Sequence, residues 1–440
     1  MNQYQFTWSY LQIESNPHVD DEKQAYAAGA LEAYLTRQLM ENQWANLLSP
    51  YCDNQTEYCS RLEDFLTKNL VYTRKQQHKF KYSDPFWNMA HLIMRQLSGL
   101  NDAFENETLD FTHELDTVTR SLVVGDLFDL EGALHRPWDS NSMSQILACS
   151  ALVKVVGDFE EMYIAHDAWF LYRGMLRIQK QYIFPWHRTA QLTGVEDIIP
   201  GHTITMSSYA GKLVSWDNFY LSSTGLAITE TSLVNSNQTL WDTVVPESGP
   251  LTWIRSAIAT RLALTSEEWV DIIGRDNSGT CNNQILVLDY KLFVPGTPIV
   301  DGTLWLYEQL PMHTSQKDIS QELRDNRYWA SYNIAYFPDI FVISDQPRIV
   351  EQYGDLYTFE NCPRAKIFKR DHVKVKDMNS MLKLMRYNDF RNDPFSVCNC
   401  TPPYNPTYAV AARYDLMDPQ GIYNTPGMYR HAVGGIDAKV

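Results

Sequence analysis

The most informative apolar pattern lies in the stretch CSALVKVVGDFEEMYIAHDAW, which begins at Cys149. Two runs rich in β-branched and apolar residues flank Gly157-Asp158, a pair typical of tight hairpin turns. The pattern predicts a β-hairpin in which Cys149 lies directly opposite His166, and a one-residue register slip would undo this pairing. The other predicted cross-strand pairs are Val153 with Met162 and Lys154 with Glu161.

Apolar periodicity elsewhere predicts helices near the N-terminus and mostly strands after Cys149. Residues 21–40 read as a helix with Asp20 or Asp21 as its N-cap. Its small residues at helical spacing (Ala25, Ala28, Gly29 and Ala33) suit close packing. Strands mixed with segregated helices indicate an α+β layered architecture. Further helices are expected at about 60–68, 86–99, 170–182, 255–273, 316–328 and 373–387, and further strands over 202–233, 284–293 and 302–309.

Composition narrows the functional classes. The chain has 440 residues, of which 44% are apolar, so it can bury a large core without help from disulfides. Its formal charge of −16 argues against a nucleic-acid surface, which needs concentrated Lys and Arg. No run of about 18 apolar residues occurs, so no membrane span is expected. The basic run at residues 366–376 could touch anionic head groups, but an ordinary solvated face is the better interpretation.

Cys149 and His166 are the first candidates for chemistry. Directly opposed β-carbons lie roughly 4.5–5.5 Å apart, which is close enough for a thiol and an imidazole to interact. The alternative is a small buried strand residue and a core histidine. No metal site and no cofactor are expected, because the histidines lack HExxH spacing and Cys398-Asn-Cys400 lacks a second ligand pair. No G-x-S-x-G elbow or phosphate loop is present either.

Many segments of the chain resemble the phospholipase B-like (lamina ancestor) family of N-terminal nucleophile hydrolases. They are CSALVK, AHDAW, YRGMLRIQK, LSSTGLAITETS, DNSGTCNNQ, RYWASYN, PRAKIF, MLKLMRYNDFRNDP and HAVGGIDAKV. The resemblance implies a four-layer αββα sandwich and an autocatalytic cut before Cys149. A helical portion 1–148 would then pack on the catalytic portion 149–440 as one structural unit. The sequence leaves open whether the N-terminal fragment stays bound after the cut.

The same resemblance implies roles around the nucleophile Cys149. Its free α-amine would act as the base, with an unperturbed pKa of roughly 7.7–8. His166 and Trp169 match the AH-x-x-W positions, where His166 would orient the nucleophile and Trp169 would supply a wall and an indole donor. Ala168 stands where relatives usually have Thr. Thr231 matches a pocket threonine, and a strand hydroxyl bonded locally is an equal alternative.

Asn282 is the preferred oxyanion donor, because a neutral amide donates without quenching a thiolate. Its neighbour Asn283 is a weaker candidate that would contact substrate, and Asn277 suits a turn better. Arg327 and Arg364 are candidates to bind a carboxylate or phosphate, although structural ion pairs are favoured for both. Two further departures from the family pattern, Cys281 for Tyr and Ile285 for Trp, would alter the pocket.

Several features suggest the secretory pathway. Cys398 and Cys400 are expected to form a local disulfide by geometry and family pattern, and Cys52 and Cys59 are also expected in a disulfide if the chain matures in an oxidising compartment. Family members are lysosomal or secreted, yet no signal peptide is visible in MNQYQF. Either the leader is missing from this sequence, which we favour, or the protein is routed differently. Glycosylation sequons occur at Asn54, Asn106, Asn237 and Asn399.

The resulting hypothesis is a hydrolase that cleaves acyl ester or amide bonds of a small-molecule or lipid substrate. Two alternatives stay open. One is an amidase acting on N-acyl or peptide-like substrates. The other is a non-catalytic lipid-binding glycoprotein that keeps the same fold.

Overall fold

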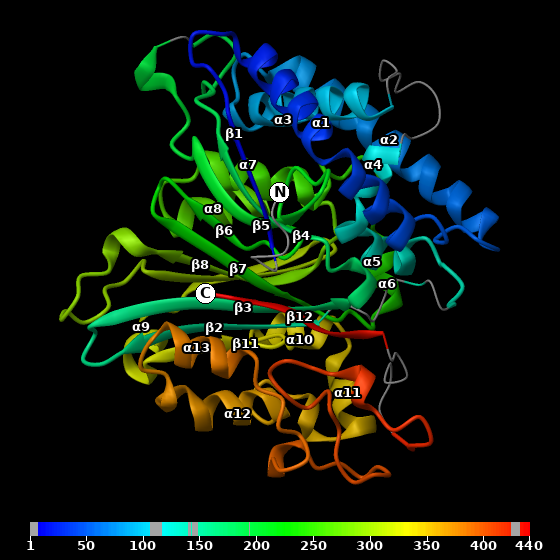
Figure 1. Cartoon of the computed structure of the whole chain (residues 1–440), viewed down its shortest axis with the longest axis vertical. Coiled ribbons are helices and arrows are strands. Elements are labelled where there is room, and N and C mark those ends of the chain that lie inside the picture. The colour runs from blue at the N-terminus through cyan, green and yellow to red at the C-terminus, as the bar shows by residue number, and fades with distance from the viewer. Residues whose placement is uncertain (1–7, 106–116, 140–141, 143–147, 193, 424–431) are drawn as a thin grey trace. The chain divides into compact units, whose positions relative to one another are not determined.

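The computed structural model describes residues 8–105, 117–139, 142, 148–192, 194–423 and 432–440. The chain divides into two compact units, each of which combines strands and helices (Figure 1), so the predicted α+β class is confirmed. The Asn106 sequon and most of the polar stretch before Cys149 lie outside the described residues. The first unit comprises Met1–Ser142, Leu176–Ile228 and Trp241–Cys281, and the second comprises Met143–Met175, Thr229–Leu240 and Asn282–Val440.

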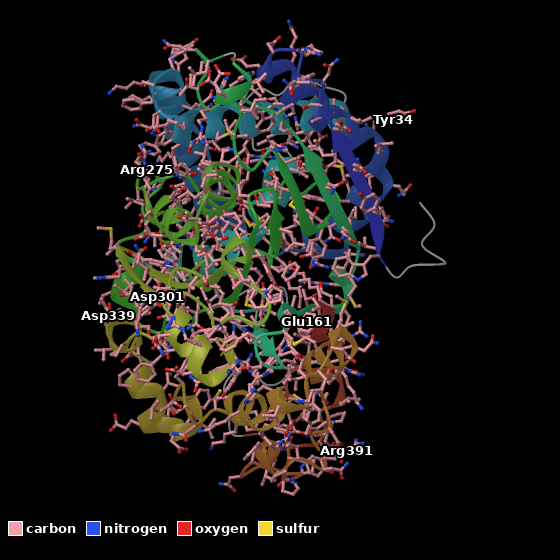
Figure 2. All side chains as sticks on the ribbon, turned by 90° about the vertical axis from the view of Figure 1, so that its left-hand side faces the viewer. Tyr34, Glu161, Arg275, Asp301, Asp339 and Arg391 are labelled. Carbon is pink, nitrogen blue, oxygen red and sulfur yellow. A yellow bond between two sulfur atoms is a disulfide. The ribbon has the colours of Figure 1, made fainter. Side chains whose placement is uncertain are left out.

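Helix α1 (Asp21–Leu47) of the first unit begins as the sequence predicts. The side chain of Asp20 accepts a hydrogen bond from the Lys23 backbone N–H at 3.0 Å, which caps the helix. Tyr34 points away from the helix into solvent and is 81% exposed (Figure 2). The other helices of this unit are α2 (Thr56–Phe80), α3 (Pro85–Glu105), α4 (Thr117–Leu122), α5 (Val124–Ala133), α7 (Thr252–Leu262) and α8 (Ser266–Gly274).

The small residues of α1 serve packing against α3. A Cβ placed on Gly29 would lie 1.9 Å from the carbonyl oxygen of Gln96, and one placed on Gly99 would lie 1.9 Å from that of Tyr26. Only glycine allows the two backbones to approach this closely. The predicted small-residue face is therefore a helix–helix contact.

The helix predicted at residues 170–182 was wrong, because strand β4 (Arg177–Ile183) occupies part of that range. Its side chains alternate as a strand requires, with Ile178, Lys180 and Tyr182 buried. The helix-favouring Lys and Gln residues misled the prediction, because pairing with neighbouring strands overrides intrinsic propensity. Strand β1 (Ser9–Glu14) pairs with β4 in parallel, and β5 (Thr203–Tyr209) pairs with its other edge. Strands β6 (Tyr220–Ser222) and β7 (Leu226–Ser232) follow, and β7 ends in the second unit.

A buried ionic contact joins α1 to β4. The Lys180 ammonium and the Tyr182 hydroxyl both donate to the carboxylate of Glu32, and all three side chains are fully buried. Burial lowers the pKa of Lys180, while the adjacent carboxylate favours its charged form. Breaking such a pair by removing one partner typically costs about 3–5 kcal/mol. Segments on both sides of the proposed cut thus share one core within the first unit.

We expect the two fragments of a chain cut before Cys149 to stay together. Strand β1 and Glu32 belong to the smaller fragment, whereas their partners in β4 belong to the larger. Cut protein should elute as one species in native size-exclusion chromatography and separate in denaturing electrophoresis. Native elution of two separate fragments would contradict this expectation.

The second unit holds a four-stranded antiparallel sheet in the order β11-β2-β3-β12. Helices α12 (Pro363–Asp371) and α13 (Met378–Met385) contribute to an apolar core with Leu152 of β2 and Ala165 of β3. Cys149 lies on the opposite face of β2 from Leu152, since strand side chains alternate. The sheet comprises β2 (Ala148–Val156), β3 (Glu161–Leu171), β11 (Tyr328–Ser331) and β12 (Val433–Lys439).

Three more strands of this unit pair in the order β8-β9-β10. The helix predicted at residues 316–328 is only partly correct, because its first residues belong to β10. None of the helices in the described part of the chain combines the length and apolar composition that a membrane span requires. The remaining elements are β8 (Asn283–Asp289), β9 (Leu304–Leu310), β10 (His313–Asp318), α9 (Ser320–Asn326), α10 (Pro338–Ile343), α11 (Gln346–Tyr353) and, ending at the boundary between units, α6 (Gln238–Trp241).

Candidate active site

The predicted hairpin exists, but its predicted register was wrong by two residues. Cys149 lies opposite Ala168, and His166 lies opposite Ala151. The turn spans residues 157–160 instead of two residues, and Phe159 within it adopts φ +60° with its side chain buried. Burial of Phe159 therefore widens the turn. The other predicted pairs fail for the same reason: Val153 lies opposite Ile164, and Lys154 opposite Tyr163.

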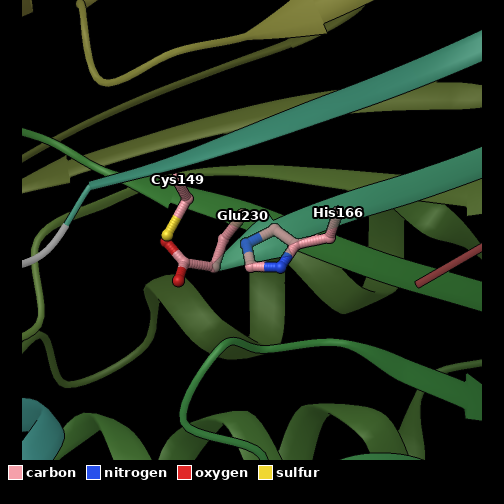
Figure 3. Close-up of side chains that lie close together, drawn as sticks. All are labelled: Cys149, His166 and Glu230. Atoms are coloured by element: carbon pink, nitrogen blue, oxygen red, sulfur yellow. The ribbon is translucent and has the colours of Figure 1, made fainter. Parts of the chain in front are cut away.

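A shift of two residues keeps every side chain on its original face of the sheet, so Cys149 and His166 are diagonal neighbours. Glu230 of β7 completes a cluster with them (Figure 3). The Cys149 sulfur, a ring nitrogen of His166 and a carboxylate oxygen of Glu230 all lie within 4.8 Å of one another, and all three residues are buried. A thiol, an imidazole and a carboxylate are groups that exchange protons once they reach hydrogen-bond distance or share one water.

Sequence reasoning missed Glu230. The only signal was a carboxylate within LAITETS, an otherwise uncharged strand. A charged residue is rarely buried without a partner, so its presence in a buried strand is informative. Its neighbour Thr231 points elsewhere. The Thr231 hydroxyl lies 2.6 Å from that of Ser331 and accepts a hydrogen bond from the Asn333 N–H at 3.1 Å. These contacts are those of a strand hydroxyl bonded locally, which was the alternative given for Thr231.

Asn333 contacts the backbone of the candidate nucleophile and was also missed. Its Oδ1 accepts a hydrogen bond from the Cys149 N–H at 3.0 Å, and its Nδ2 donates to the Ser232 carbonyl at 2.8 Å. Asn333 adopts φ +68°, a left-handed conformation that Asn tolerates better than most residues. The segment RYWASYN contains this residue, but nothing in the sequence distinguishes it from a turn asparagine.

Arg364 contacts Cys149 at its carbonyl group. Its guanidinium donates to the carbonyl oxygens of Cys149 and of Tyr332, the latter at 2.6 Å, and lies 4.4 Å from the ring centroid of Trp169. Burial lowers the pKa of Arg364. The Trp169 indole N–H donates to Asp167 and to the Val410 carbonyl, each at 3.1 Å. Trp169 thus supplies a wall, and its indole donor is already engaged.

A cavity of 350 Å³ opens beside this constellation. Ala148, Trp169, Asn333 and Arg364 line it next to the candidate cleavage position. Ligand pockets typically pair such an apolar lining with a few polar groups at one end. Most of the remaining lining is aromatic or aliphatic and includes Val234, Tyr332, Ile334, Ile349, Leu356, Tyr357, Tyr408 and Tyr414.

The remaining candidates from the sequence are Asn282, Asn283 and Arg327. Asn282 accepts the Leu233 N–H at 2.8 Å through its carbonyl oxygen, which places it beside Ser232 and hence near the Asn333 amide. Asn283 begins β8, and both asparagines are buried.

Arg327 does not reach the site. It follows α9, lies over the Phe159 ring and contacts Asp158 at 3.4 Å, at the far end of the hairpin. The structural role favoured for Arg327 describes its position.

The three departures from the family pattern are also located. Ala168 lies directly opposite Cys149, where a larger side chain would face the thiol. Ile285 is buried in β8. Cys281 belongs to the first unit and adopts φ +54°.

Both predicted disulfides are present, joining Cys52 to Cys59 and Cys398 to Cys400. Two of the sequons, Asn54 and Asn399, have exposed side chains. The side-chain amide of Asn237 instead donates to the Ile343 carbonyl at 2.8 Å. A glycan attached here would replace one of the two hydrogens on the nitrogen that donates to Ile343.

Cys149, His166 and Glu230 also offer the ligand types that Zn²⁺ takes at sites with one open position. Sequence spacing could not reveal this set, because its members come from separate strands. Asn333 and Arg364 hold the main chain of Cys149, whose sulfur lies beside His166 and Glu230.

Comparisons with known proteins give a consistent result. A sequence model of the family described as Phospholipase B matches residues 2–440. A protein of Bos taurus named "Putative phospholipase B-like 2" is 38% identical over 442 residues, covering 98% of this chain and 74% of its own length. The Homo sapiens protein of the same name is 37% identical over 447 residues, with the same shares covered. "Phospholipase B-like protein B" of Dictyostelium discoideum is 34% identical over 446 residues, again covering 98% and 74%.

Proposed function

Because this chain belongs to the phospholipase B family, we propose that it is a hydrolase that cleaves acyl ester or amide bonds through the thiol of Cys149. One observation carries the proposal. Asn333 holds the backbone nitrogen of Cys149, while the sulfur of the same residue lies beside His166 and Glu230. A residue held at both its nitrogen and its sulfur is suited to act as nucleophile and base together. We propose that the fold is the sandwich of N-terminal nucleophile hydrolases.

Maturation would begin in the uncut chain, where Cys149 has no free amine. His166 or Glu230 takes the thiol proton, and the sulfur attacks the carbonyl carbon of Ala148. The peptide C–N bond breaks as the nitrogen gains a proton, which leaves a thioester between Ala148 and the Cys149 sulfur. Water then hydrolyses the thioester, releasing the Ala148 carboxylate and restoring the thiol. The buried acid–base pair thus serves the first step, before the amine exists.

Turnover would use the new α-amine. The amine takes the thiol proton, the sulfur attacks the acyl carbonyl, and the leaving alcohol or amine departs with that proton. Water hydrolyses the acyl-enzyme in the second half of the reaction. Asn333 would orient the amine through its Oδ1, and Arg364 would fix the Cys149 carbonyl. The apolar 350 Å³ cavity suits an acyl chain.

The test uses processed protein with an ester and an amide of one fatty acid. N-terminal sequencing should find Cys149 as the first residue of the larger fragment, and acyl release should separate esterase from amidase. Processed protein that binds the acyl compound and releases no product from either substrate would overturn the hydrolase proposal. That result would favour the lipid-binding alternative.

The two disulfides support our proposal of a lysosomal or secreted location, because such bonds persist in oxidising compartments.

We expect Asn282→Ala to lower kcat by about 10²–10³-fold, the typical loss when one oxyanion donor is removed. KM should stay within a few-fold, because the amide stabilises charge that develops only in the transition state. Asn283→Ala is the matched control, since adjacent side chains of an extended segment point to opposite faces. Steady-state kinetics on processed protein would measure both. Normal turnover by Asn282→Ala alongside a crippled Asn283→Ala would show that the wrong asparagine was chosen.

A further inference from the structure

A second hollow, of 260 Å³, lies in the first unit beside helices α2 and α3. Arg74 and His78 of α2, Lys81 just after it, and His91 and Arg95 of α3 line it. The spacing 74, 78, 81 and the spacing 91, 95 each place side chains on one helix face. No residue in this lining is acidic among those that the structure describes.

The carboxylate of Glu22, in the first turn of α1, contacts three of these side chains. It lies 2.9 Å from the Lys81 ammonium, 2.8 Å from the His91 ring and 4.0 Å from the Arg95 guanidinium. The hydrogen bond from Lys81, with help from His91, lowers the pKa of Glu22 to about 2. Glu22 is therefore ionised, and its one negative charge lies against two permanently charged side chains, those of Lys81 and Arg95.

These basic side chains are not simply a solvated surface. The Lys81 and His91 side chains are only 13% and 14% exposed. Burial lowers the pKa of His91 and outweighs the opposing hydrogen bond with Glu22, and the positive charges of Lys81 and Arg95 also lower it. The whole chain carries a formal charge of −16, so its general field repels anions. A recessed cationic hollow on an acidic protein selects a multiply charged anion.

We propose that this hollow binds a phosphate monoester group, carried either by a soluble molecule or by a lipid head group. Arginine and lysine are the side chains that recognise phosphate, through forked and point-charge contacts respectively. A phosphate dianion in the hollow would lie within reach of the Arg74, Lys81 and Arg95 side chains that line it. One water occupies about 30 Å³, so the 260 Å³ hollow has room for the phosphate and part of the molecule that carries it. The hollow is separate from the proposed hydrolase chemistry and does not depend on it.

The experiment measures binding of inorganic phosphate to the full chain by titration calorimetry at low ionic strength, where charge contacts are least screened. Vesicles of phosphatidylcholine containing phosphatidic acid, compared with pure phosphatidylcholine vesicles, test the lipid source. The double variant Arg74→Gln with Arg95→Gln should weaken phosphate binding at least about tenfold, because two charge-assisted contacts are lost. Glu22→Gln should tighten binding several-fold by removing the competing carboxylate.

Lys75→Gln combined with Lys79→Gln is the matched control. Both lysines are exposed on α2 outside the hollow, so this variant loses the same charge and should bind within about twofold of the wild type. Binding of phosphate, or of phosphatidic acid vesicles alone, that is lost in the arginine variant and kept in the lysine variant supports the site and identifies its source. Equal binding by both variants, or no binding to either probe, overturns it.

Discussion

Cys149→Ala is expected to yield a chain that stays at full length and releases no acyl product. The substitution removes the only atom proposed to attack the Ala148 carbonyl, so the amine that serves as base in turnover is never exposed. Loss of a nucleophile leaves at most the small residual rate supplied by binding and oxyanion contacts. Denaturing electrophoresis with N-terminal sequencing reports the cut, and acyl release reports turnover.

Cys362→Ala is the matched control for this experiment. Cys362 is also a buried free thiol of the second unit and lines the same cavity. Its sulfur accepts the Ala365 N–H at 3.4 Å at the start of α12, a role unrelated to nucleophilic attack. We expect this variant to mature and turn over normally. Complete maturation of Cys149→Ala would rule out self-cleavage and indicate an outside protease.

Asn333→Gly is expected to slow both maturation and turnover, the latter by on the order of 10³-fold, within the range that positioned acid–base groups contribute. Glycine is chosen because it accepts the φ of +68° found at this position without strain. The variant loses the Oδ1 atom that holds the Cys149 nitrogen and the Nδ2 contact with Ser232. Single-turnover assays on whatever fraction matures would separate the chemical step from substrate binding.

Asn333→Asp distinguishes orientation of the amine from a purely structural role. It keeps an acceptor oxygen but adds a negative charge, which raises the pKa of a neighbouring amine. Because the amine must be deprotonated to act as base, the acidic limb of the pH–rate profile should move to higher pH. A profile that is lower throughout but unmoved would mean that Asn333 acts only through the fold.

The sequence predicted secondary structure where local apolar patterning dominates. The hairpin carrying Cys149 follows from its two β-branched runs, and α1 follows from the cap at Asp20. The register failed because it depends on where one side chain packs: Phe159 turns inward and lengthens the loop. The strand over 177–183 was missed because Lys180 finds a buried carboxylate in a helix far away in sequence.

The candidate site was predicted only in the part that lies on the hairpin. Cys149 and His166 share a face of the sheet in either register, so their proximity survives the shift. Glu230 and Asn333 reach Cys149 from segments remote in the chain, and no single-chain pattern reports such contacts. Arg364 was a candidate for anion binding, with a structural ion pair favoured, yet its donors go to backbone carbonyls, because nearby acceptors are known only once the chain is folded.

The parallel pairing of β1 with β4 has a consequence for the refolding of the cut protein. In the uncut chain these strands are covalently tethered, so they meet at a high effective concentration while folding. A cut before Cys149 would remove the tether and convert an intramolecular encounter into a bimolecular one. Once the cut protein unfolds, its two fragments would reassemble only slowly. Its persistence would rest on the height of the unfolding barrier more than on the equilibrium between folded and unfolded states.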